Sequence, residues 1–148
     1  MSTQAVTSTS MRANSVSTRS LWGSRILTAI PVLFLLMDAI MKLAKPGFVV
    51  QATIQLGYSA GVIVPLGILL LTCVVLYVLP QTSVLGAILL TGYLGGAVAS
   101  HVRSGDPLFS HIFFPVYVGI LIWGGLYLRE PRLRALVPIR NSAAQQNG

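Results

Sequence analysis

Ionisable and hydroxyl side chains are concentrated in one short stretch of this chain, residues 101–111, which we call the polar cluster. When such groups share a partly dehydrated pocket, they can relay protons, act as general acids and bases, or bind an anion or a quinone headgroup. A stabilised loop without chemical function has the same composition, so both interpretations stay open. The polar cluster consists of His101, Arg103, Ser104, Asp106, Ser110 and His111.

Asp38 is a further candidate because it lies within an apolar segment. A charged side chain near the middle of a bilayer costs about 2.5 to 3.5 kcal/mol, so one that is present usually faces protein and has a partner. Lys42 lies four residues later, on the same face of a helix, and can provide that partner. The alternative is that Asp38 points inward and meets the polar cluster.

The sequence does not favour other kinds of site. Two histidines with Asp38 and Asp106 would suit zinc or iron, but no helix-borne spacing such as HxxxH fixes them, and we predict no metal site. Cys73 is the single cysteine, which excludes an intramolecular disulfide and a CxxC redox pair. The chain contains no Gly-rich phosphate loop, Rossmann fingerprint or Ser-His-Asp order.

The elements that position these side chains are long and apolar. No Lys, Arg, Asp or Glu occurs between Lys45 and Arg103, or from Pro107 to Leu128. Hydrophobic residues make up 54% of the chain and charged residues 9%, whereas soluble domains contain about 25% charged residues. This composition is typical of a membrane protein in a lipid bilayer. Basic residues lie near the ends and in loops rather than on a patch with aromatic residues, so we expect no nucleic-acid partner.

Four segments are long enough to cross a bilayer, which takes about 20 mostly apolar residues in a helix. The sequence predicts an all-α, four-helix transmembrane bundle within residues 21–138, flanked by disordered segments at residues 1–20 and 139–148. The predicted spans are residues 25–43, 62–79, 84–102 and 111–128. A cleaved signal or transit peptide is the alternative for the N-terminal region, but Asp38 and Lys42 within the first apolar run favour an uncleaved helix.

The segment between the first and second spans has helical signals of its own. Pro46 offers a helix start and Gly57 a helix stop, and Phe48, Ala52 and Leu56 fall on one face between them. We therefore predict a short interfacial helix that caps the bundle on the membrane surface. An irregular apolar loop is the alternative.

The distribution of basic residues predicts the orientation of the bundle. Most of the ten Lys and Arg residues flank the two ends of the chain, and positive residues favour the cytoplasmic side. Both termini are therefore expected in the cytoplasm, and Asp38, Lys42 and the polar cluster on the outer side. Aromatic residues expected at the cytoplasmic boundary are Trp22, Tyr77, Trp123 and Tyr127.

Small residues recur along the third predicted span and favour close helix packing. Gly92, Gly96 and Ser100 follow one another at intervals of four residues, and Gly95 lies on a neighbouring stripe. Such stripes let helix backbones approach closely in a membrane. We expect this span to be the central helix of the bundle, packed through Gly92, Gly95 and Gly96; the alternative is a homodimer interface of the GxxxG kind.

Several pieces of the sequence, in order, are similar to those of a known family. They are residues 65–71 (PLGILLL), residues 86–97 (GAILLTGYLGGA), His101-Val102-Arg103, residues 106–111 (DPLFSH), and Phe114-Pro115-Val116-Tyr117, with Asp38, Lys42 and Pro46 before them. On these residues the chain resembles the DoxX-like family of small bacterial membrane proteins over approximately residues 24–138. The family is similar to DoxX proper, a four-span subunit associated with quinone-linked sulfur oxidation. The resemblance implies a bacterial inner membrane, redox subunits as partners, and a quinone as the cofactor class.

The polar cluster and the resemblance together lead to one functional hypothesis, an accessory subunit of a quinone-linked oxidoreductase. In it, Asp38 and His101 relay protons, Arg103 and Lys42 bind an anionic or quinone oxygen, and Asp106 and His111 shape the mouth of the site. One alternative is a non-enzymatic scaffold subunit. Another is a small-solute or proton carrier, which the lack of ionisable residues in the cytoplasmic half of the spans disfavours.

Overall fold

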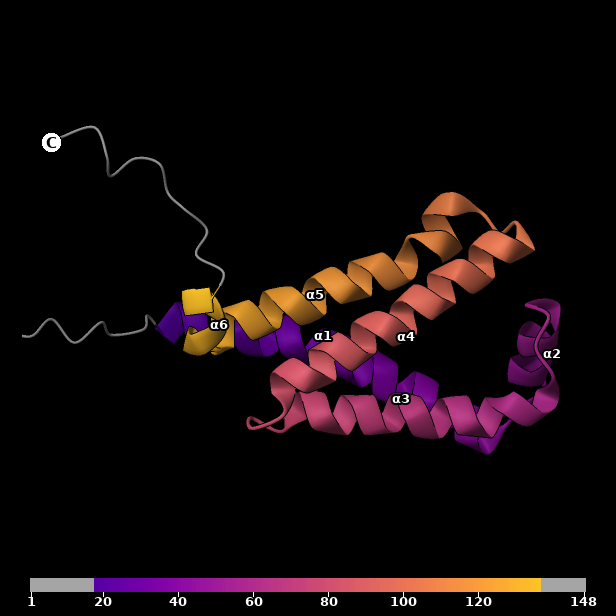
Figure 1. Cartoon of the computed structure of the whole chain (residues 1–148), viewed down its shortest axis with the longest axis horizontal. Helices are drawn as coiled ribbons and strands as arrows, with labels where there is room; N and C mark the ends of the chain where they lie inside the picture. Colours follow the sequence, from indigo (N-terminus) through magenta and orange to yellow (C-terminus); the bar gives the residue numbers. More distant parts are fainter. Residues whose placement is uncertain (1–17, 137–148) are drawn as a thin grey trace, which may run out of the picture.

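The computed structural model describes residues 18–136, and this part of the chain is helical without a strand. Two short helices, α2 and α6, and two single-turn segments, η1 and η2, accompany four long helices (Figure 1). The elements are α1 (Thr18–Ala44), α2 (Gly47–Gln55), η1 (Ala60–Val62), α3 (Ile63–Val78), α4 (Ser83–Ser104), η2 (Leu108–Ile112), α5 (Phe114–Arg129) and α6 (Pro131–Leu136).

Within residues 18–136, four helices are long and apolar enough to cross a membrane, which confirms the predicted fold class. These stretches are Arg25–Ala44, Ala60–Val78, Ser83–Ser104 and Phe109–Arg129. The short helix predicted between the first and second spans is α2. The predicted terminal segments fall outside the described residues, except for residues 18–20, which begin α1.

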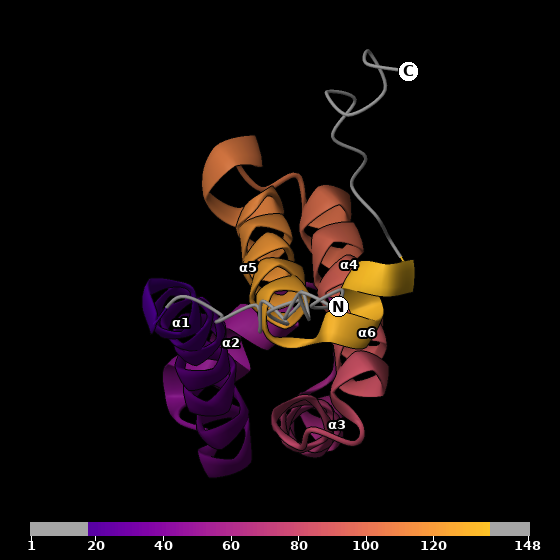
Figure 2. The same ribbon diagram turned by 90° about the vertical axis from the view of Figure 1, so that its left-hand side faces the viewer.

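The four long helices form a ring in which α1 and α4 each pack against both α3 and α5 (Figure 2). No helix is therefore central, contrary to the expectation for the third span, because every long helix has two main neighbours. The side chains that meet inside the ring are buried and mostly apolar, among them Leu35, Leu70, Tyr77, Leu90, Ile122 and Leu126. Large apolar side chains are also exposed on the outside, including Leu33, Ile68, Ile88 and Ile120. An apolar exterior of this kind suits a bundle solvated by lipid.

Tyr77 lies in the last turn of α3, and its side chain points into the bundle. Its side chain is fully buried, and its hydroxyl group donates a hydrogen bond to the Ile122 carbonyl oxygen at 2.9 Å. The Arg129 guanidinium group donates to the Tyr77 carbonyl oxygen at 2.5 Å and stacks over the Tyr77 ring. These contacts connect α3 to α5 at the end of the bundle where α1 begins and α6 lies (Figure 1).

Close helix contacts occur at Gly86 and Gly125, two glycines outside the middle of α4. A Cβ atom added at Gly86 would lie 2.5 Å from the Tyr77 Cα atom, so α4 contacts the backbone of α3 there. A Cβ atom at Gly125 would lie 2.6 Å from the Thr28 Oγ1 atom of α1. Nothing lies within 4 Å of a Cβ atom built at the three predicted packing residues, which are Gly92, Gly95 and Gly96. The small residues in the middle of α4 therefore border open space in the single chain.

From the contact at Gly86, α3 and α4 diverge toward the end of the bundle where α2 lies (Figure 1). At that end α2 runs across the direction of the long helices, and the connection from α4 to η2 lies on the same side (Figure 1). The polar cluster and the α2 segment, predicted at one end of the bundle, are thus at the same end.

Candidate functional site

A cavity of about 520 Å³ lies at the α2 end, bounded by α1, α2, α3 and α4. Small-molecule sites in proteins usually have volumes of about 300 to 1,000 Å³, with mostly apolar walls and a few polar groups. The apolar wall residues include Phe48, Val49, Ala52, Leu56, Leu66, Leu69, Gly92, Gly96 and Ala97. The polar ones are Asp38, Lys42, Thr53, Tyr58, Tyr93, Ser100 and His101. This composition suits a small, largely apolar ligand with a polar end.

Asp38 and Lys42 form an ion pair on the cavity wall. The Lys42 Nζ atom donates to the Asp38 Oδ1 atom at 2.5 Å, one helical turn away on α1. The side chains are 19% exposed for Lys42 and 32% exposed for Asp38, so both are partly buried. The partner of Asp38 is therefore Lys42 rather than a residue of the polar cluster. The pair carries no net charge, which lowers the cost of placing it beside an apolar space.

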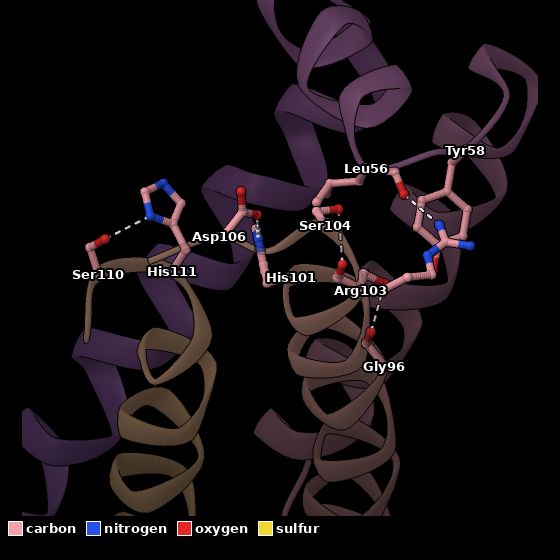
Figure 3. Close-up of polar contacts among 10 residues, drawn as sticks. Leu56, Tyr58, Gly96, His101, Arg103, Ser104, Asp106, Ser110 and His111 are labelled. Atoms are coloured by element: carbon pink, nitrogen blue, oxygen red, sulfur yellow. Dashed lines mark hydrogen bonds and ion pairs between the residues drawn. The ribbon is translucent and has the colours of Figure 1, made fainter. Parts of the chain in front are cut away.

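His101 lies at the same end of the cavity and is oriented by Asp106. Its Nδ1 atom is 2.6 Å from the Asp106 Oδ2 atom, and both side chains are partly buried (Figure 3). Gly105 makes this contact possible because it ends α4 with a φ angle of 73°, and the Asp106 amide then donates back to the His101 carbonyl oxygen. With Nδ1 engaged by the carboxylate, Nε2 is the ring nitrogen left for a ligand. Asp106 therefore acts on the cavity through His101 rather than by lining it.

Arg103 connects α4 to the segment that follows α2. Its guanidinium group donates to the Leu56 carbonyl oxygen at 2.5 Å and lies 5.5 Å from the centre of the Tyr58 ring (Figure 3). The Tyr58 hydroxyl group is 2.6 Å from the Ser100 Oγ atom of α4. Gly57 lies between Leu56 and Tyr58 in the chain and has a φ angle of 80°. A Cβ atom at Gly57 would be 2.8 Å from the Arg103 guanidinium group. Arg103 thus secures the cover formed by α2, and its side chain is not part of the cavity wall.

His111 lies outside the cavity. It is exposed, and its Nδ1 atom is 2.7 Å from the Ser110 Oγ atom within η2 (Figure 3). Its ring centre is 5.7 Å from that of His101, so the two rings are neighbours without sharing a ligand set. Within residues 18–136, no group of three His, Cys, Asp or Glu side chains is arranged to bind a metal ion.

The structure thus divides the predicted site residues into three groups. Asp38, Lys42 and His101 line the cavity, Asp106 orients His101, and Arg103 and His111 make other contacts. Tyr58 and Tyr93 are wall residues that the sequence did not predict. Tyr58 directly follows the helix stop at Gly57, and this position was the one signal for it in the sequence. The sequence has no such signal for Tyr93, because an aromatic residue in an apolar span usually packs against other helices.

A smaller hollow of about 220 Å³ lies on the other side of α4, against α5. It is bordered by Thr91, Leu94, Gly95, Val98, Pro115, Val116, Gly119 and Trp123. The Trp123 Nε1 atom donates to the Thr91 Oγ1 atom at 2.9 Å across it. None of these side chains is ionisable, so of the two spaces the larger cavity is the one with ionisable wall residues.

The protein-family model of the DoxX-like family matches residues 26–125 of the chain. The match covers most of the chain and runs from α1 into α5, so it contains every wall residue of the larger cavity. Searches of curated proteins and of solved structures found no match.

Proposed function

Since this chain belongs to the DoxX-like family and is a multi-pass membrane protein, we propose that it binds a quinone in the larger cavity, as an accessory subunit of a membrane redox complex. The observation that supports this most is the combination of apolar walls with Lys42 and His101 at one end of a space of about 520 Å³. A quinone ring has apolar faces and two carbonyl oxygens that accept hydrogen bonds. It therefore needs the kind of wall that this cavity has.

The side chains at the polar end have complementary roles in this proposal. A quinone becomes a quinol by taking up two electrons and two protons, and the electrons would come from a partner redox subunit. The His101 Nε2 atom would donate a hydrogen bond and then a proton to one carbonyl oxygen, while Asp106 holds the ring through Nδ1; the second proton would reach the other carbonyl oxygen from water on the outer side. Lys42, paired with Asp38, would orient the ring through the same oxygen.

We place the site at the outer side of a bacterial plasma membrane, with both termini in the cytoplasm. The support is the distribution of basic residues: Arg129 ends α5, and Arg132 and Arg134 belong to α6, at the end of the bundle opposite α2. In this orientation, protons for the quinone would come from the outer side.

The test is quinone binding by the chain purified in mild detergent, measured by isothermal titration calorimetry with decylubiquinone. His101→Gln should weaken binding about 2- to 10-fold, because one hydrogen bond to the ring contributes about 0.5 to 1.5 kcal/mol. His111→Gln is the matched control, since it is the same substitution outside the cavity, and its affinity should equal that of the wild type. The proposal fails if the wild type binds no quinone or if both variants weaken binding equally.

A structural subunit is the second candidate, favoured by the hollow between α4 and α5. Gly95 and Gly119 border this hollow and would let a helix of a partner subunit approach closely. In that case Gly95→Leu would reduce assembly with the partner in native membranes, and His101→Gln would leave assembly unchanged.

A further inference from the structure

The larger cavity extends beyond the polar groups at its α2 end. Its wall residues on α4 extend from Gly92 to His101, which corresponds to about 14 Å along a helix at 1.5 Å per residue. Lys42 and His101 lie toward the α2 end of the cavity, and Asp38 lies one helical turn further in on α1. The remainder lies between Leu66 and Leu69 of α3 and Gly92 and Gly96 of α4, where α3 and α4 diverge (Figure 1).

This apolar part is open toward the side of the bundle. Leu69 lines the cavity and is nevertheless 50% exposed, and Gly92 and Gly96 are exposed as well. The end of the cavity near α2 is covered instead, because Arg103 and Tyr58 connect the segment after α2 to α4. An apolar ligand therefore meets less obstruction from the lipid side than from the end of the bundle.

The glycines leave this space open without being needed for packing. A Cβ atom at Gly92 or Gly96 meets nothing within 4 Å, so larger side chains could be present without disturbing a helix contact. Such side chains would instead project into the cleft between α3 and α4. The cleft has room for a slender apolar chain because both positions are glycine.

We infer that the ligand of this cavity carries a long aliphatic chain, that it enters sideways from the bilayer, and that this chain stays between α3 and α4, passing Gly96. The assignment of a quinone headgroup rests on the proposed function; the place of the aliphatic chain does not. The ligand class is therefore an amphiphile, with its polar end at Lys42 and His101 and its chain continuous with the lipid.

The first experiment compares two quinones with the same ring, one with a decyl chain and one without. Gly96→Leu should weaken binding of decylubiquinone at least 10-fold and leave the affinity for 2,3-dimethoxy-5-methylbenzoquinone within 2-fold of the wild type. Gly95→Leu is the matched control, because it is the adjacent residue, its Cβ atom is equally unobstructed, and it borders the other hollow. It should change neither affinity. Equal weakening of both quinones by Gly96→Leu would overturn the inference.

The second experiment needs no quinone. Tyr93 lines the cavity, so Tyr93→Trp in a chain with Trp22 and Trp123 replaced by Phe reports whether lipid chains reach it. In bilayers of dibrominated phosphatidylcholine its fluorescence should be strongly quenched, and adding Gly96→Leu should reduce the quenching by at least half. Absent quenching would overturn the lateral opening. If the Tyr93→Trp fluorescence is quenched but the protein binds neither quinone, the lateral entry of an aliphatic chain stands and the quinone function is rejected.

Discussion

Replacing Gly86 by alanine should destabilise the bundle strongly, because Gly86 is where α4 packs against the backbone of α3. The added Cβ atom would lie 2.5 Å from the Tyr77 Cα atom and 2.7 Å from the Leu76 carbonyl carbon. Ordinary contacts of this kind are 3.4 to 4 Å long. Both obstructing atoms belong to helix backbone, which cannot rotate away as a side chain can. The two helices must therefore move apart by about 1 Å at Gly86, the contact from which they diverge.

The expected cost is about 3 kcal/mol, the upper part of the range of about 1 to 3 kcal/mol for overpacking a well-packed core. That corresponds to a loss of about 100-fold in the folding equilibrium constant. Gly125→Ala should cost less, about 1 kcal/mol, because its nearest obstruction is the Thr28 hydroxyl group and the backbone atoms lie 3.2 Å away or more. Gly95→Ala should be neutral or stabilising by up to about 1 kcal/mol, since alanine favours helix and the site is open.

The assay is reversible unfolding by sodium dodecyl sulfate in mixed micelles, followed by far-ultraviolet circular dichroism. Gly86→Ala should have the lowest midpoint, Gly125→Ala an intermediate one, and Gly95→Ala one equal to or above that of the wild type. If Gly92→Ala or Gly95→Ala destabilised the chain as much as Gly86→Ala, the middle of α4 would be a packing surface. That result would refute the conclusion that Gly92 and Gly95 border open space.

Two further substitutions test contacts at opposite ends of the bundle. Arg103→Gln removes the charged hydrogen bond to Leu56 and the stacking on Tyr58 that secure the segment after α2. Amide hydrogen exchange in α2 should therefore accelerate about 10-fold or more. Arg132→Gln, at the other end of the bundle, should leave this exchange rate unchanged. Unchanged exchange in Arg103→Gln would mean that packing alone positions α2. Tyr77→Phe leaves the Ile122 carbonyl oxygen without the buried donor and should cost about 1 to 2 kcal/mol in the same detergent titration; a cost near zero would refute the role given to that bond.

The architecture of the chain could be predicted from the sequence because hydropathy and charge determine it directly. Apolar runs without charged residues locate the spans, and the turn after Ser104 and the helix beginning after Pro46 follow from Gly, Pro and Asp at the boundaries. The order of helices around the ring has no comparable signal. It depends on which faces contact one another, and apolar residues occur on every side of all four spans.

For the candidate site, the sequence predicted the end of the bundle at which it lies but not which residues form it. His101 and Arg103 are two residues apart on α4, which places them about 200° apart around a helix of 3.6 residues per turn. Only one of the two can therefore face the cavity, and the sequence does not say which. His111 belongs to a different element, η2, whose π-helical turn directs it away. A dense run of polar residues thus identifies an end of the bundle without identifying the members of a site.

Small residues on α4 illustrate why a glycine pattern is ambiguous in a membrane helix. At Gly86 the missing side chain permits a backbone contact, while at Gly92 and Gly96 it leaves a space between helices that have already separated. Both arrangements follow from one crossing of α3 and α4, because two straight helices in contact near one end are farthest apart near the other. The contact at Gly86 and the cavity beside His101 are therefore two consequences of the same helix geometry. The width of the cavity is determined at Gly86, which is not one of its wall residues.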